Sequence, residues 1–178
     1  RAIKRGSGET GAAALSEVKF EGYGPSGIAV LVEALTDNRN RTVQDVRRLF
    51  TRHGGNLGES GCVSWLFESR GVITVESNAS NAEEIALRAI DAGAEDFKTE
   101  KGYVEIYTQP QDLEKIRKVI EEKERVISAE LSLTPKNTML LDEKKAVQAL
   151  NFLDELEGLD DIQRVFSNID FSEATLER

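Results

Sequence analysis

Hydrophobic and polar positions follow two different spacings along the chain, and these spacings predict its helices and strands. Apolar residues three and four positions apart predict amphipathic helices, because such positions share one face of a helix. Short runs of β-branched and aromatic residues predict strands. The predicted helices cover residues 42–53, 81–92, 110–123 and 142–157, and the predicted strands cover 17–22, 28–35, 61–68, 72–76, 95–99, 103–108, 126–133 and 162–168.

The order of these elements predicts an α+β fold with two domains. The segment 81–133 runs helix, strand, strand, helix, strand, which fits a ferredoxin-like sandwich if one more strand joins its sheet. The final helix and strand, at 142–168, contain too little β structure to form a sheet of their own, so we expect them to complete the first domain. The alternative is two consecutive units with this helix and strand as an appendage. The prediction is therefore two ferredoxin-like α/β sandwich domains, the second inserted into the first: an α+β domain with a basic helix at 17–79 plus 137–178, and an acidic inserted domain at 80–136.

Positive charge is concentrated on one predicted helix and the loop before it. Between Arg39 and His53 there are five arginines and one acid, Asp45, so the formal charge of this segment is about +4. The whole chain carries −9, which leaves about −13 on the remainder. Such a local excess in an acidic chain is typical of a surface that meets a polyanion. The five are Arg39, Arg41, Arg47, Arg48 and Arg52.

The predicted basic helix is amphipathic. Thr42 is its expected N-cap, with Asp45 as the acid of a capping box. Apolar residues share one face, and Arg41, Arg48 and Arg52 project from the other. A solvated surface is the ordinary interpretation of such arginines; the neighbouring Arg39, Asn38 and Asn40 favour a surface that contacts phosphates.

Glycine-rich segments flank this helix, but neither the one at 22–27 nor the one at 54–61 matches a nucleotide-binding pattern. We interpret Tyr23, Gly24 and Pro25 as a tight turn or as a loop that probes a binding partner. Trp65 lies in the predicted strand 61–68 and is expected in the core, with base stacking on an exposed ring as the less favoured interpretation. Cys62, in the same strand, is expected to be a buried structural thiol.

The composition argues against an enzyme and against a metal site. One His and one Cys make a zinc site improbable, and they do not provide a nucleophile–base–acid set. No cofactor is expected. Without a membrane-length apolar run or a signal peptide, the chain is expected to be soluble and cytoplasmic in a bacterium, or mitochondrial or plastid in a eukaryote. A cluster of acids predicts a solvated acidic edge, which could also meet a basic protein partner: Asp154, Glu155, Glu157, Asp160 and Asp161.

Three motifs carry a resemblance to a known family. EGYGP, LTDNRNRT and GGNLG occur in this order at spacings like those of the YebC/PmpR family, and the similarity continues through 92–96 to the C-terminus. The resemblance implies a third domain inserted in the second, and a DNA-binding transcriptional regulator. The family's mitochondrial relatives include a translational activator of cytochrome oxidase. The resemblance also implies that residues 1–16 are the remnant of an N-terminal helical domain and a linker, with Lys4 and Arg5 adding to the binding surface.

The predicted function is therefore a non-enzymatic regulator of gene expression that binds DNA through its arginine-rich helix and loop. The alternative is a ribosome-associated translation factor that contacts rRNA or tRNA with the same surface. DNA and RNA remain open, because the chain carries no helix-turn-helix, zinc-finger or RNP signature. The candidate binding residues are Lys4, Arg5, Asn38, Arg39, Asn40, Arg41, Arg47, Arg48 and Arg52, with Tyr23, Gly24 and Pro25 as the loop probe.

Overall fold

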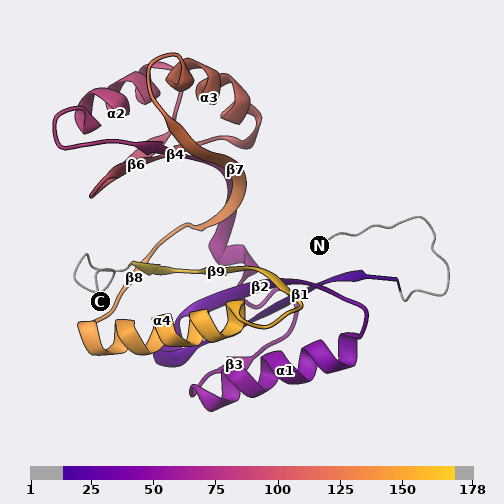
Figure 1. Ribbon diagram of the computed structural model, residues 1–178. Helices are drawn as coiled ribbons and strands as arrows, with labels where there is room; N and C mark the ends of the chain where they lie inside the picture. Colours follow the sequence, from indigo (N-terminus) through magenta and orange to yellow (C-terminus); the bar gives the residue numbers. More distant parts are fainter. Residues whose placement is uncertain (1–13, 171–178) are drawn as a thin grey trace. The chain divides into compact units, whose positions relative to one another are not determined.

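The computed structural model describes residues 14–170, and these form an α+β fold of two compact units (Figure 1). The first unit contains the described residues up to Leu66 and those from Pro135 onward. The second unit is the segment Phe67–Thr134. The second unit is thus formed by a segment that interrupts the first.

The first unit is a four-stranded sheet with two helices on one face. Its strands are ordered β3-β1-β2-β9, and each neighbouring pair is antiparallel. The helices pack their apolar faces on β1, β2 and β9. The elements are β1 (Ser16–Tyr23), β2 (Ala29–Thr36), α1 (Arg39–Arg52), β3 (Asn56–Leu57), α4 (Glu143–Glu157) and β9 (Ile162–Ser167), with 3-10 turns at Pro25–Gly27 and Ser64–Leu66 and a short parallel pair, β8 (Met139–Leu140) and β10 (Ile169–Asp170).

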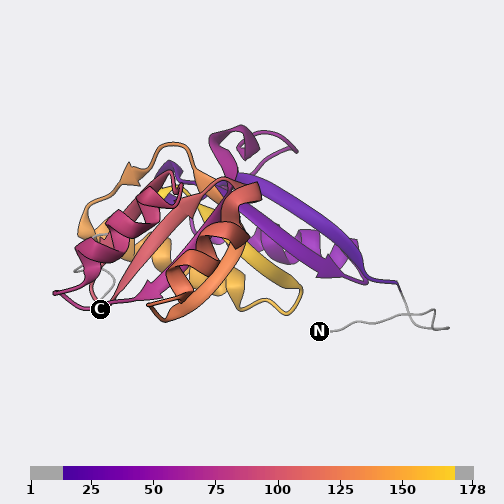
Figure 2. The ribbon, with the colours of Figure 1, turned by 90° about the horizontal axis from the view of Figure 1, so that it is seen from above.

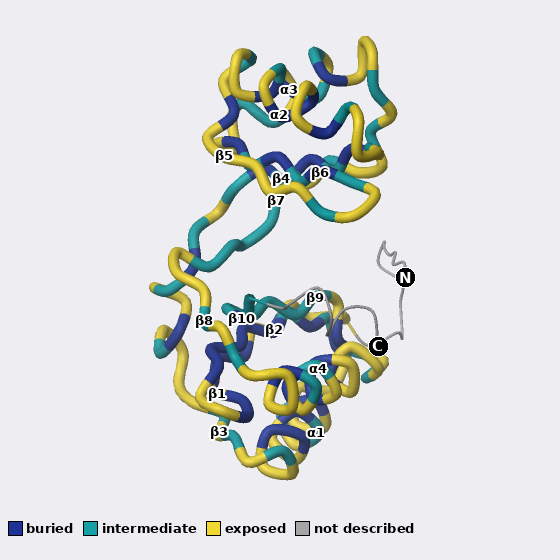
Figure 3. Tube along the Cα trace, turned by 90° about the vertical axis from the view of Figure 1, so that its left-hand side faces the viewer, coloured by how far each residue is buried: buried dark blue, intermediate teal, exposed yellow. Residues whose placement is uncertain are grey.

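The core of this unit follows the alternation of its strands. Val18 and Phe20 of β1 are buried against the helices, as are the matching residues of β2. Phe50 of α1 and Phe152 of α4 meet edge to face, with ring centroids 4.9 Å apart. Such an aromatic pair stabilises the fold by about 1 kcal/mol beyond the contribution of the apolar area that it buries. The layer between helices and sheet is accordingly the buried part of the unit in Figure 3.

The second unit is a β-α-β-β-α-β sequence with the sheet order β5-β6-β4-β7. Its helices lie side by side over the sheet, as Figure 2 shows from above. Ile73, Val75, Val104 and Ile106 are fully buried beneath them. The elements are β4 (Phe67–Glu76), α2 (Ala82–Asp91), β5 (Asp96–Glu100), β6 (Tyr103–Thr108), a 3-10 turn (Pro110–Asp112), α3 (Leu113–Glu121) and β7 (Val126–Pro135).

Hydrogen bonds join the two chain segments that connect the units, one bond inside each unit. Within the second unit, the Thr134 hydroxyl donates to the Glu68 carbonyl at 3.4 Å. Within the first unit, the Lys136 N–H donates to the Leu66 carbonyl at 2.8 Å. The chain therefore leaves the first unit and returns to it at neighbouring points.

Three details of the predicted architecture are wrong. The predicted strands 61–68 and 72–76 are a loop followed by the single strand β4, because Gly71 lies inside the strand opposite Thr108 of β6. Since β4 belongs to the second sheet, the unit boundary falls after Leu66 rather than after residue 79. The first unit also departs from ferredoxin-like connectivity, because β1 and β2 are consecutive before α1. No helix within residues 14–170 is long and apolar enough to cross a membrane.

Candidate nucleic-acid interface

The helix α1 begins earlier than the sequence predicts, because Asn38 is its N-cap. The Asn38 Oδ1 atom accepts the N–H of Arg41 at 3.1 Å. Asparagine is among the preferred N-cap residues because its side chain accepts an unpaired N–H of the first turn. Thr42, the predicted cap, instead lies in the first turn and is buried. Arg39 and Asn40 consequently belong to the helix and not to the preceding loop.

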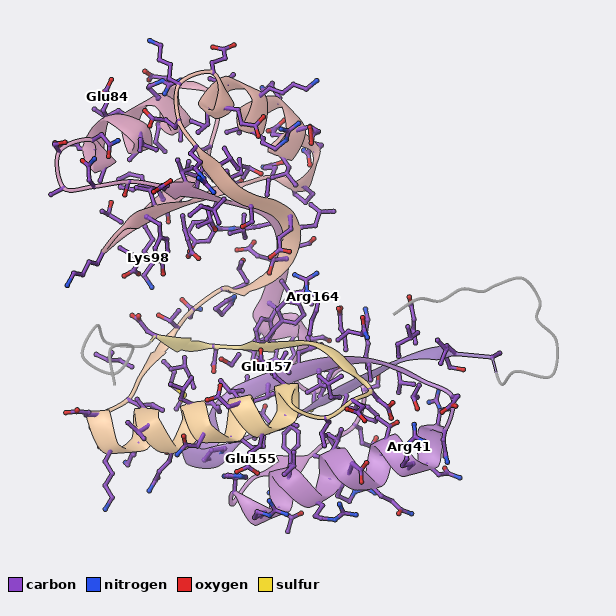
Figure 4. All side chains as sticks on the ribbon, viewed as in Figure 1. Arg41, Glu84, Lys98, Glu155, Glu157 and Arg164 are labelled. Carbon is purple, nitrogen blue, oxygen red and sulfur yellow. The ribbon has the colours of Figure 1, made fainter. Side chains whose placement is uncertain are left out.

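Thr42 and Arg41 are tied to an acid that follows α4. The Thr42 hydroxyl donates to Asp161 Oδ2 at 2.7 Å, and Arg41 Nη2 donates to the same oxygen at 2.9 Å. Thr36 also binds this carboxylate, and Arg41 reaches Asp37 at 3.2 Å. Burial raises the pKa of Asp161, but the bonds from Arg41 and Thr42 outweigh it and hold the pKa below its ordinary value. Arg41, one of the predicted binding residues and labelled on α1 in Figure 4, therefore joins the start of α1 to the loop before β9 through Asp161.

Two further arginines of the predicted site also have acidic partners. Arg48 Nη1 lies 3.2 Å from Asp45 Oδ1, one turn earlier in the helix. Arg52 Nη1 lies 3.2 Å from Glu155 Oε1 of α4, which is also 3.3 Å from His53 Nε2. The acids were predicted to form a solvated edge, but Glu155 and Asp161 are partners of α1. The reason is that α4 packs beside α1, so the two charged helix flanks meet.

The remaining two arginines, Arg39 and Arg47, are exposed and form no ion pair with any side chain of residues 14–170. Arg47 belongs to an exposed row of α1 that contains amide and hydroxyl groups but no acid. Its members are spaced at i, i+4, i+7 and i+11, which places them on one face. We call this row the polar stripe: Asn40, Gln44, Arg47 and Thr51.

The polar stripe carries the kinds of group that bind phosphate oxygens, namely a guanidinium, amides and a hydroxyl. Gln44 and Thr51 are not among the candidates predicted from the sequence. Their helical spacing from Arg47 was the available signal, but only the ion pairs show which side of the helix is left without acids. The predicted Lys4 and Arg5 lie outside the described residues.

The loop probe is reduced to one residue. Gly24 and Pro25 are buried, and a Cβ atom on Gly24 would come within 2.8 Å of the Phe152 ring. The GYGP turn is therefore packed against α4. Tyr23 is 42% exposed and is the residue of the three that can meet a partner.

The prediction that Trp65 belongs to the core is wrong. Trp65 lies in a 3-10 turn and is 64% exposed, while Val63 fills the interior. The Trp65 Nε1–H donates to the Cys62 carbonyl at 3.0 Å, and the Tyr23 hydroxyl donates to the same oxygen at 3.5 Å. Tyr23 and Trp65, here called the aromatic pair, are thus brought together at one carbonyl.

A buried acid holds the loop that carries Trp65. Glu21 is 7% exposed, and its carboxylate accepts the N–H groups of Gly61, Val63 and Ser64 at 2.9, 3.0 and 2.8 Å. Burial raises the pKa of Glu21, but these three bonds lower it overall, below its ordinary value. These three N–H groups bind a carboxylate and are not available for pairing with another strand. The predicted strand at 61–68 therefore does not form over residues 61–66.

Cys62 is partly exposed instead of buried as predicted. Burial raises the pKa of its thiol, and the charge of Glu21 raises it further. The thiol is therefore protonated near neutral pH, as expected for a structural cysteine. Among residues 14–170, no group of three or more His, Cys, Asp or Glu side chains is arranged to hold a metal ion.

The chain is similar to proteins of one family over nearly all the described residues. The family model described as TACO1/YebC second and third domain matches residues 15–169. A probable transcriptional regulatory protein of Dehalococcoides mccartyi strain CBDB1 is 54% identical over 179 residues, which cover 100% of this chain and 71% of that protein. A probable transcriptional regulatory protein of Thermotoga petrophila is 45% identical over 178 residues, covering 99% of this chain and 70% of that protein.

A solved structure has the same fold. The crystal structure of the conserved hypothetical protein Aq1575 from Aquifex aeolicus is 42% identical and superposes with a TM-score of 0.81. The match covers 93% of this chain and 69% of that one. With a family model across both units and relatives above 50% identity, this chain belongs to the TACO1/YebC family.

Proposed function

We propose that this protein is a non-enzymatic, cytoplasmic regulator of gene expression that binds DNA through α1. The observation that carries the proposal is the acid-free polar stripe, in which Arg47 has no acidic partner among residues 14–170, in a chain of net charge −9. The names of the bacterial relatives support a role in transcription. Local positive charge on an acidic protein limits nonspecific contact and directs a polyanion to one surface.

The five arginines have different roles in this proposal. Arg39 and Arg47, with Asn40, contact phosphates directly. Arg48 and Arg52 add positive potential while each remains paired with an acid, Asp45 and Glu155 respectively. Arg41 positions the helix through Asp161.

The domain organisation enters the proposal as well. The second unit has the β-α-β-β-α-β connectivity of a ferredoxin-like domain. We assign the basic surface to the first unit and treat the acidic second unit as an inserted domain available to a basic protein partner.

The test compares two adjacent arginines that differ in their partners. Fluorescence anisotropy with a labelled promoter-sized duplex, over a series of salt concentrations, would give the affinity of the wild type, Arg47→Ala and Arg48→Ala. Loss of one phosphate contact in Arg47→Ala should lower the slope of log K against log salt by about one. Arg48→Ala should change the slope less, because Arg48 is paired with Asp45. Equal effects of the two substitutions would contradict the assignment of the polar stripe.

A second candidate function is that of a ribosome-associated translation factor that contacts rRNA or tRNA. The aromatic pair favours it, because unpaired RNA bases stack on exposed aromatic rings whereas the bases of a duplex are already stacked. Co-sedimentation with ribosomes distinguishes the two functions. Association that persists at moderate salt, beside weak and salt-sensitive duplex binding, would replace the first proposal with the second.

A further inference from the structure

The aromatic pair combines the last residue of β1, Tyr23, with Trp65 of the 3-10 turn before β4. The Trp65 ring is anchored to the Cys62 carbonyl at 3.0 Å, and the Tyr23 hydroxyl approaches the same oxygen at 3.5 Å, while much of both rings remains exposed. Aromatic side chains normally bury most of their area. Two large rings exposed together at one point are therefore a candidate contact surface.

The backbone beneath the aromatic pair is locked by buried contacts. Three N–H groups of residues 61–64 bind the Glu21 carboxylate, and Val63 between them is fully buried. Burying a carboxylate is unfavourable unless it is fully hydrogen-bonded, so this arrangement fixes one conformation of the loop. Trp65 is consequently held in position before any partner arrives.

The surroundings of the aromatic pair decide what it can bind. Between His53 and Leu66 there is no Lys or Arg, and Glu59 is exposed. This loop therefore offers no cation to a phosphate, and its contribution must come from ring faces. A flat, neutral ring surface of this kind matches a nucleobase, which stacks on aromatic side chains whatever its identity.

The position of Tyr23 limits the form of the nucleic acid. Tyr23 and Glu21 alternate with Phe20, so they lie on the sheet face opposite to α1. Tyr23 pairs with Asn56 of the edge strand β3, which follows the end of α1. A flexible single strand that contacts α1 can pass this edge and reach Tyr23 on the other face.

We propose that Tyr23 and Trp65 form a stacking site for unpaired bases of a single-stranded nucleic acid. This inference rests on the proposed function, because α1 supplies the phosphate contacts that bring the strand to the rings. It adds a second surface to the phosphate contacts of α1, and its preference for unpaired nucleotides favours the second candidate function over binding of a DNA duplex.

The experiment uses the single tryptophan of the chain as its own reporter. The 178-residue chain is titrated with a twelve-nucleotide oligo(U) and with a duplex of equal length, and tryptophan fluorescence is recorded. Stacking on Trp65 should quench the emission with the single strand and leave it nearly unchanged with the duplex. Labelled oligo(U) then gives affinities for Trp65→Ala, Tyr23→Ala and the control Trp65→Phe. Loss of one stacked base in Trp65→Ala should weaken binding by about 5- to 140-fold, while Trp65→Phe retains most of the affinity.

Salt dependence separates this inference from the proposed function. The ratio between wild-type and Trp65→Ala affinities should stay constant with salt, because a neutral contact releases no counterions. Binding of oligo(U) that depends on Arg47 but causes no quenching and survives Trp65→Ala would overturn the stacking site and leave the proposed function standing. Equal quenching by the duplex would also overturn the preference for unpaired bases. Absence of any nucleic-acid binding would overturn both.

Discussion

The guanidinium of Arg41 donates to the carboxylate of Asp161 at 2.9 Å, across 120 positions of the sequence. This contact joins the first turn of α1 to the loop that leads into β9. Thr42 donates to the same carboxylate oxygen at 2.7 Å. The first turn of α1 thus contains both Arg39, a proposed phosphate contact, and Arg41, which has a structural role.

Removing the Asp161 carboxylate should destabilise the first unit. Asp161→Ala removes the carboxylate oxygen that Thr42 and Arg41 share as an acceptor, and we expect a loss of about 1–3 kcal/mol in the free energy of unfolding. Urea denaturation measures this value. Asp160→Ala is the matched control, because Asp160 is the adjacent, exposed acid. A similar loss in both variants would show that the Asp161 bonds contribute nothing specific.

Reversing the charge of Arg41 should mainly affect stability, and reversing the charge of Arg47 should mainly affect nucleic-acid binding. Arg41→Glu places a negative charge beside Asp37 and Asp161, so it should lower the unfolding midpoint. Arg47→Glu removes no ion pair within the described residues, so it should leave stability within about 0.5 kcal/mol and weaken nucleic-acid binding. Thermal melts beside anisotropy titrations distinguish these effects. If Arg47→Glu bound as well as the wild type, Arg47 would have no role in the interface.

Acidification should destabilise the fold through Glu21 and Asp161. The pKa of each is lower in the folded protein than its ordinary value, because N–H, hydroxyl or guanidinium donors outweigh burial. Each carboxylate therefore stabilises the folded state above its unfolded pKa, and this contribution is lost as the pH falls below about 4 and through the folded pKa. Urea midpoints between pH 3 and pH 7 measure the loss. Glu21→Gln should be less stable at pH 7 and should show a smaller decrease on acidification; an unchanged decrease would exclude Glu21 as a contributor.

Gly55 should not tolerate a side chain. A Cβ atom there would lie 2.2 Å from the carbonyl oxygen of Tyr23 and 2.9 Å from the Cα of Gly24. Because both neighbours are backbone atoms, Gly55→Ala should cost at least about 2 kcal/mol of stability. Gly158→Ala is a suitable control, since a Cβ atom there would lie at an ordinary 3.5 Å from its nearest neighbours, the carbonyl oxygens of Asp154 and Glu155. Equal unfolding midpoints for the two variants would contradict the close approach of β1 and the end of α1.

The sequence predicted best those elements whose stability comes from their own periodicity. The helix expected at 142–157 is α4 at Glu143–Glu157, and the strand expected at 103–108 is β6 at Tyr103–Thr108. The elements that were predicted wrongly depend on contacts with residues far away in the sequence. The residue types at 61–66 are typical of a strand, but backbone N–H groups of this segment bind Glu21, about 40 residues earlier.

The same reason explains why the candidate site could be predicted only in part. The arginine-rich segment is visible in the sequence, and helical spacing places its side chains on the exposed side of α1. Which arginines are free depends on acids such as Glu155, 103 positions after Arg52. Local patterns cannot show these pairings, since they arise from the packing of α1 beside α4.

The hydrogen bond from Lys136 to Leu66 has a consequence for the order of folding. The first unit is assembled from two lengths of chain, and closing the long loop between them has an entropic cost that grows with the logarithm of loop length. The second unit holds its own ends together, as the bond from Thr134 to Glu68 shows. Once that unit has folded, the two lengths are joined by what behaves as a short connection. Early folding of the inserted segment would thus accelerate completion of the sheet that carries α1.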